Sequence, residues 1–109
     1  MAYDEDLAER IRAQLSERDD VTEKKMFGGL AFLVGGNMAV AASGQGGLMV
    51  RCDPVATADH VVDGADPMIM RGKPMNGWLR VSDQRVSDDN ALAHWVRVGT
   101  TTAGNLPAK

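Results

Sequence analysis

The 109-residue chain is 44% hydrophobic and 25% charged, with a net charge of −3 at pH 7. This length suits one domain with one core, so we expect a single domain over residues 1–109. The longest apolar runs are about five residues, which excludes a membrane-spanning segment. The acidic N-terminus lacks the apolar stretch of a secretory signal, and the single cysteine excludes an internal disulfide. We therefore expect a cytoplasmic protein.

The first expected element is a helix from Asp4 to about Arg18. Leu7, Ile11 and Leu15 recur every four residues and form one apolar stripe. Asp4 is placed to cap the helix, and the acids of the first turn suit the positive end of its dipole. We interpret this acidic segment as a solvated surface rather than as a docking surface.

Short apolar runs alternate with glycine clusters between residues 21 and 51, as in antiparallel strands joined by tight turns. Strands are expected at Val21–Phe27, Leu30–Val34, Met38–Ala42 and Leu48–Val50. The glycines supply the positive φ angles that tight hairpins need. They lack the Gly-Lys-Ser/Thr ending of a phosphate-binding loop, so we interpret them as hairpin residues.

A short helix is expected to begin at Asp53–Pro54 and to end near Gly64. Two further strands are expected at Met68–Arg71 and Trp78–Ser82, joined by a basic loop over Gly72–Gly77. Pro74 is expected to keep this loop out of the interior of a sheet.

The last expected helix begins at Ser87 and frays over Thr100–Thr102, which are poor helix formers. Its apolar face contains Leu92, Trp95, Val96 and Gly99. The chain order is then helix, several strands, short helix, two strands, helix. This order predicts an α+β fold, with an antiparallel sheet and helices mainly on one face. Phe27 and Phe32 are the expected core anchors.

No catalytic or metal-binding set is recognisable in the sequence. A metal site needs three or four converging ligands, whereas the chain has one cysteine, Cys52, and two histidines, His60 and His94. We interpret Cys52 as a small buried core residue, and we expect no metal, no cofactor and no enzymatic activity. The alternative is a small-molecule-binding or enzymatic domain, with a pocket near Cys52 and His60 and the Arg71–Gly77 loop as its lid.

The run Lys25-Met26-Phe27-Gly28-Gly29 carries a resemblance to a known family. An expected strand follows this run, and after it come Gly36, Met38, Leu48 and Asp53. Together these features resemble the N-terminal domain of the TfoX/Sxy family. The resemblance is closest over about residues 4–54 and looser over Asp88–Pro107. In full-length members a helical domain follows this one, so we expect a stand-alone domain here.

The resemblance implies an α+β sandwich similar to secretion chaperones and a regulatory domain without enzymatic activity. The namesakes regulate competence and are thought to act with the cAMP receptor protein at promoters. A protein partner, of the transcription-regulator class, is therefore implied. We interpret the five-residue motif itself as structural: Gly28-Gly29 is expected to form a turn or bulge with positive φ, or to allow two backbones to approach closely.

An interaction face is expected on the side of the sheet away from the helices, where it would expose Ala31, Leu33, Ala39, Ala41 and Met49. Because these residues alternate with expected core residues, both faces of the sheet are apolar, and an exposed apolar patch marks an interaction site. We expect a homodimer or a docked partner on it; the alternative is that the tail from Thr100 covers it.

Direct nucleic-acid binding is not expected, because the isoelectric point is about 5.2. It would require the basic residues between the two terminal helices to gather on one face. These candidates for weak anion contacts are Lys24, Lys25, Arg71, Lys73 and Arg80.

Overall fold

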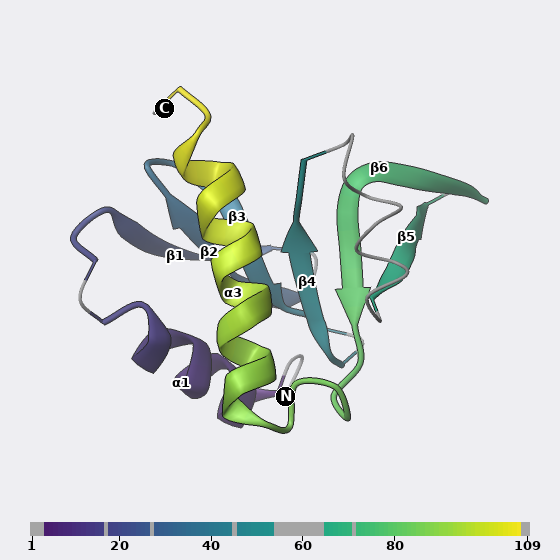
Figure 1. The fold of residues 1–109 in the computed structure, drawn as a ribbon, viewed down its shortest axis with the longest axis horizontal. Helices are drawn as coiled ribbons and strands as arrows, with labels where there is room; N and C mark the ends of the chain where they lie inside the picture. Colours follow the sequence, from purple (N-terminus) through teal and green to yellow (C-terminus); the bar gives the residue numbers. More distant parts are fainter. Residues whose placement is uncertain are drawn as a thin grey trace.

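The computed structural model describes residues 4–16, 18–26, 28–44, 46–53, 65–70 and 72–107. Within these residues the elements are α1 (Glu5–Gln14), β1 (Val21–Met26), β2 (Gly29–Val34), β3 (Asn37–Ala42), β4 (Leu48–Arg51), β5 (Asp66–Met70), β6 (Lys73–Val81) and α3 (Asp89–Gly104). The strands form one six-stranded sheet in the order β1-β2-β3-β4-β6-β5, and each neighbouring pair is antiparallel. Figure 1 shows α1 and α3 on the same face of this sheet. The predicted α+β class is confirmed.

The first four strands form the meander that the glycine spacing predicts. Gly28 has φ 75° in the β1–β2 turn, and Gly35 and Gly36 have φ 58° and 85° in the β2–β3 turn. Gly46 and Gly47, in the turn before β4, also have positive φ angles, of 89° and 77°. Residues with a Cβ rarely adopt these angles, so the glycines fix where the strands end.

The second half of the sheet differs from the prediction in one respect. Residues 73–77 are not a loop, because β6 begins at Lys73 and pairs with β5 through Pro74, opposite Ile69. Pro74 is tolerated because β4 pairs only with Trp78–Val81, which leaves the start of β6 with one neighbour. The expected lid is therefore a strand. The expected helix over residues 54–64 lies outside the described residues.

Helix α3 is longer than its composition suggests. Fraying at Thr100–Thr102 was expected, but α3 continues to Gly104 because its last turns pack against the sheet. Thr100 is buried, and Ala103 packs with Val34 of β2 and Ala39 of β3. Tertiary packing here outweighs weak helix propensity. The first helix is shorter than expected and ends at Gln14, while Asp4 caps it by accepting bonds from the amides of Asp6 and Leu7.

The chain after α3 stays on the helix side of the sheet. Asn37, at the start of β3, is buried, and its Nδ2 donates a hydrogen bond of 2.9 Å to the carbonyl oxygen of Pro107. The alternative that the tail from Thr100 covers the opposite face is therefore wrong for the part that the structure describes.

The main core lies between the two helices and the sheet. Phe32 is completely buried there, as predicted, whereas Phe27 lies outside the described residues. Helix α1 contributes Leu7 and Ile11, and helix α3 contributes Leu92 and Trp95.

Gly99 marks the closest approach of α3 to the sheet. A Cβ built at this position would lie 2.5 Å from the carbonyl oxygen of Ala39 and 2.6 Å from Cγ1 of Val40. Alanine usually stabilises a helix interior by up to about 1 kcal/mol over glycine, but overpacking of this kind costs about 1–3 kcal/mol.

We therefore expect Gly99→Ala to lower the free energy of unfolding by about 1 kcal/mol, measured by urea denaturation. Gly104→Ala is the matched control, because nothing lies within 4 Å of its added Cβ. It should be neutral or stabilising. Equal behaviour of the two variants would contradict the close approach of α3.

Candidate interaction surface

We call the side of the sheet opposite α1 and α3 the far face. It carries an apolar cluster of its own. Ala31, Ala41 and Met49 are buried at its centre, and the partly buried Leu33, Met38 and Trp78 pack against them. The prediction that both faces of the sheet are apolar is confirmed.

A β-bulge changes the membership of this face. Phe32 pairs with Val40 and Leu33 pairs with Met38, so Ala39 is an extra residue of β3 without a partner on β2. Ala39 is buried on the helix side, where it packs with Ala103. The prediction that Ala39 lies on the far face is therefore wrong, and Met38 takes its place.

The predicted exposure also needs correction. Ala31, Ala41 and Met49 are 0%, 4% and 9% exposed, so they form the floor of the cluster and not a bare surface. The apolar side chains of the cluster that reach solvent are Leu33, Met38 and Trp78, which are partly buried. Whether this face docks a partner stays a prediction.

Direct cross-strand pairs place charged residues at both ends of the floor. Lys24 of β1 is opposite Ala31, and the row continues through Ala41 and Met49 to Arg80 of β6. Directly opposed residues project from the same face of a sheet. Two of the predicted anion contacts, Lys24 and Arg80, are therefore on the far face. Asp66 of β5 is paired with Arg80 at the end of this row.

Arg51 and Trp78 form a second pair on the far face. They are opposite each other on β4 and β6, and the guanidinium carbon of Arg51 lies 5.3 Å from the centre of a Trp78 ring. This is the geometry of a cation–π contact. In the part of the chain that the structure describes, neither Arg51 nor Lys24 is in an ion pair.

Two arginines of α1 are paired with acids. Arg10 binds Asp89 at 2.8 Å, and Arg12 binds Glu9 and makes a two-bond contact of 2.6 and 2.7 Å with Glu23. The hydrogen bonds from Arg12 hold the pKa of Glu23 below its usual value, although partial burial opposes them. Arg10 and Arg12 are thus paired with acids, whereas the described strand residues of the far face carry three bases and one acid.

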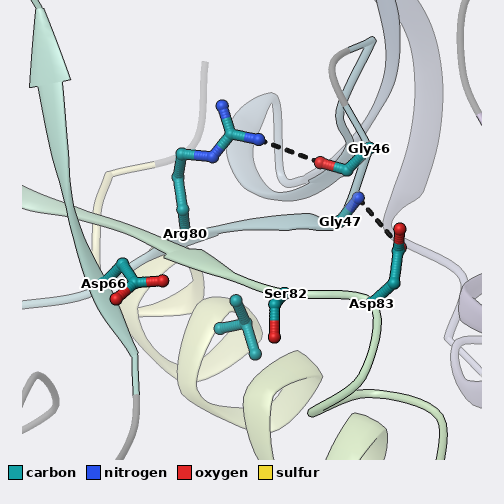
Figure 2. A pocket seen from close by; sticks show the side chains of 7 residues that line it. Gly46, Gly47, Asp66, Arg80, Ser82 and Asp83 are labelled. Carbon is teal, nitrogen blue, oxygen red and sulfur yellow. Dashed lines mark hydrogen bonds between the residues drawn. The ribbon is translucent and has the colours of Figure 1, made fainter.

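A shallow cavity of about 240 Å³ lies at the Arg80 end of the far face. Figure 2 shows Arg80, Asp66, Ser82 and Asp83 around it, next to the turn that contains Gly46 and Gly47. An Nη of Arg80 donates to the carbonyl oxygen of Gly46 at 2.9 Å, and the amide of Gly47 donates to Asp83 at 2.9 Å. These bonds tie the β3–β4 turn to β6 and to Asp83, two residues beyond it, so Arg80 and Asp83 have a structural role.

The sequence profile of the TfoX N-terminal domain matches residues 13–103, which is most of the chain. The chain belongs to the TfoX N-terminal domain family. A search of curated proteins found no match. No helix among the described residues of this TfoX N-terminal domain is long and apolar enough to cross a membrane.

The family motif of the TfoX N-terminal domain forms the β1–β2 turn. Lys25 is exposed at the end of β1, and Gly28 takes the positive φ that the turn needs. A Cβ on Gly29 would overlap the carbonyl oxygen of Ala42. Both structural explanations predicted for this glycine pair are confirmed, each for a different residue. Phe27, and the side chain of Met26, lie outside the described residues.

Of the alternative site predicted around Cys52, the structure of the TfoX N-terminal domain describes only some residues. Cys52 is 1% exposed, and its amide donates to the carbonyl oxygen of Gly77 at 2.8 Å, so it is a buried core residue as predicted. His60 and Arg71, and the side chain of Lys73, lie outside the described residues. The described residues contain no group of three potential metal ligands.

Sequence reasoning missed Met38, Arg51 and Trp78 as far-face residues. For Arg51 and Trp78 the signal is present: each lies two residues from a far-face residue, Met49 and Arg80 respectively, and side chains alternate along a strand. For Met38 there was no such signal, because the bulge shifts the alternation.

Proposed function

We propose that this TfoX N-terminal domain is a regulatory domain without enzymatic activity, which docks an acidic surface of a protein partner on its far face. The observation that supports the proposal is the combination of an apolar cluster with Lys24, Arg51 and Arg80 on a face opposite both described helices. The family resemblance suggests that the partner is a transcription regulator.

The residue types of the far face suit protein recognition. Tryptophan, methionine and arginine are enriched in protein interfaces, and buried tryptophan and arginine carry much of the binding energy. Trp78 and Arg51 are in contact, so a partner would meet an aromatic ring and a positive charge together. Leu33 and Met38 supply the apolar contact beside them.

The charge of the far face favours a different protein over a second copy. In a two-fold contact through this face, each copy would present the same three bases to the other. Like charges that are brought together and desolvated oppose association. An acidic partner instead neutralises Lys24 and Arg51, and charge complementarity also speeds its encounter with the domain.

A pair of charge reversals tests the proposal. Arg51→Glu changes the far face, and Arg97→Glu makes the same change on the exposed side of α3. Both variants, together with the parent, are immobilised and used to capture proteins from native cell extract, and retained proteins are quantified by mass spectrometry. We expect a specific partner to be retained by the parent and by Arg97→Glu, with a loss of about tenfold or more for Arg51→Glu.

Circular dichroism and thermal unfolding of both variants show whether the fold is kept. If Arg51→Glu is folded and retains the same proteins in the same amounts as Arg97→Glu, the far face does not dock the partner.

A further inference from the structure

The outer edge of β1 is a second candidate contact surface, which shares Lys24 with the far face. In the order β1-β2-β3-β4-β6-β5, β1 lies at one end of the sheet, and β2 is its only neighbour among the strands that the structure describes. Figure 1 shows β1 at the side of the molecule away from β5 and β6. Residues 22–25 are exposed along it. The opposite edge strand, β5, contains Pro67, which cannot donate a ladder bond.

No described segment pairs with the outer side of β1. The amide of Gly35 donates to the carbonyl oxygen of Asp20 at 2.9 Å, and the register of β1 on β2 has no shift. Residues of an antiparallel pair alternate between bonded and non-bonded positions. Even-numbered residues of β1 therefore bond to β2, whereas Val21, Glu23 and Lys25 direct their amides and carbonyls outward.

The charges of this edge are self-complementary. Residues 19–25 read Asp-Asp-Val-Thr-Glu-Lys-Lys, with acids on one side of Thr22 and two lysines on the other. Asp19 and Asp20 lie just before β1, where the carbonyl of Asp20 still bonds Gly35 and its carboxylate pairs with Arg18. If a second copy runs antiparallel with Thr22 opposite Thr22, then Asp20 is opposite Lys24, which would compete with Arg18 for it, and Asp19 is opposite Lys25. Each of these pairs occurs twice, so four opposite-charge pairs form.

We propose that β1 pairs with β1 of a second copy, antiparallel about a two-fold axis at Thr22, and joins two sheets into one. The outward groups of Val21 then bond those of Glu23 in the other copy, in both directions. Opposite-charge and Thr–Thr cross-strand pairs both stabilise antiparallel strands.

Other two-fold registers of the same strand are disfavoured. A two-fold axis at Val21 places Asp19 opposite Glu23, so that two acids meet. An axis at Glu23, Lys24 or Lys25 places that residue opposite its own copy, so that two like charges meet as well. Charged side chains also protect edge strands from unspecific pairing. The order of the charges along this edge suits pairing of β1 with β1 of a second copy. Since a single-strand contact is small, the dimer is weak and depends on concentration and salt.

This inference does not rest on the docking proposal, and the two fail separately. The edge dimer uses the charges of residues 19–25, whereas docking is tested at Arg51. Arg51→Glu should leave the dimer intact, and Arg97→Glu should do so too.

Charge-swapped variants test the pairing. Lys24→Asp/Lys25→Asp makes the edge acidic, and Asp19→Lys/Asp20→Lys makes it basic except at Glu23. We expect the parent to dimerise at high concentration and low salt in analytical ultracentrifugation, and each double variant to dimerise about tenfold more weakly or worse. An equimolar mixture of the two variants, and the quadruple variant with both changes, should recover the dimer.

A parent that is monomeric at the highest concentration reached overturns the proposal. So does a dimer that survives in both double variants, or one that neither the mixture nor the quadruple variant recovers. Circular dichroism of each variant separates lost pairing from lost folding.

A cysteine trap tests the register. Opposed residues in a non-bonded antiparallel pair have Cα atoms about 4.5 Å apart, which a disulfide can span. Thr22→Cys should therefore form a dimeric disulfide in a glutathione buffer, while Cys52 is buried. Glu23→Cys is the control, because residue 23 lies opposite Val21 of the other copy. Equal cross-linking of the two variants would overturn the Thr22 register.

Discussion

Phe32→Ala should lower the free energy of unfolding by about 3–5 kcal/mol, the usual cost of truncating a buried phenylalanine. Phe32 is 0% exposed and lies in the core cluster between the two described helices and the sheet. A chain of this size has about 5–15 kcal/mol of stability in total, so the variant should be partly unfolded or melt far below the parent.

Urea denaturation gives the change in the free energy of unfolding, provided that the slope of this free energy against urea concentration is the same for both proteins. Leu106→Ala is the control, since Leu106 is exposed after α3 and its truncation should change little. A Phe32→Ala variant with the same free energy of unfolding as the parent would contradict the position of the core.

The two glycines of the family motif should respond differently to substitution. Gly29→Ala should cost about 1–3 kcal/mol, because its Cβ meets the backbone of Ala42 and lies 3.1 Å from the amide of Gly44. At Gly28 nothing lies within 4 Å, and only the φ of 75° opposes alanine. Gly28→Ala should then cost about 1 kcal/mol.

Asparagine separates the two causes. It tolerates positive φ better than alanine, so Gly28→Asn should be milder than Gly28→Ala. Its larger side chain should make Gly29→Asn worse than Gly29→Ala. Thermal unfolding of the four variants measures this order, and a reversed order at either position would contradict the assigned cause.

The strands of the meander could be predicted because local chemistry decides them. Glycines at residues 28, 35, 36, 46 and 47 mark the turns through their positive φ. The cap at Asp4 and the buried stripe of α1 are local signals of the same kind. The family motif could be located for the same reason, since it is a contiguous run.

The errors come from contacts between distant segments. Helix α3 continues through Thr100–Thr102 because Ala103 meets Val34 and Ala39, and no local pattern contains that contact. The bulge at Ala39 moves one alanine to the helix side and Met38 to the far face, which a strict two-residue alternation cannot show. Pro74 enters β6 because β4 is too short to pair with that end.

An apolar interaction face could be predicted from the sequence, but the full set of its residues could not. Alternation along β2 and β4 correctly places Ala31, Leu33 and Met49 on the far face. That Lys24 and Arg80 stand at opposite ends of one cross-strand row depends on the order of six strands, in which β6 lies beside β4. Strand order is set by tertiary packing and was not readable from the spacing of residues.

Site-specific photo-cross-linking tests the central claim, that the far face docks a protein partner, most directly. A photoreactive phenylalanine analogue is placed at Leu33 on the far face or at Arg97 on the exposed side of α3. The domain is then irradiated in native cell extract. We predict a discrete adduct with one acidic protein from position 33 that is absent from position 97, and that Arg51→Glu removes it. Adducts of equal yield from both positions, or none from position 33 in a folded domain, would contradict the account.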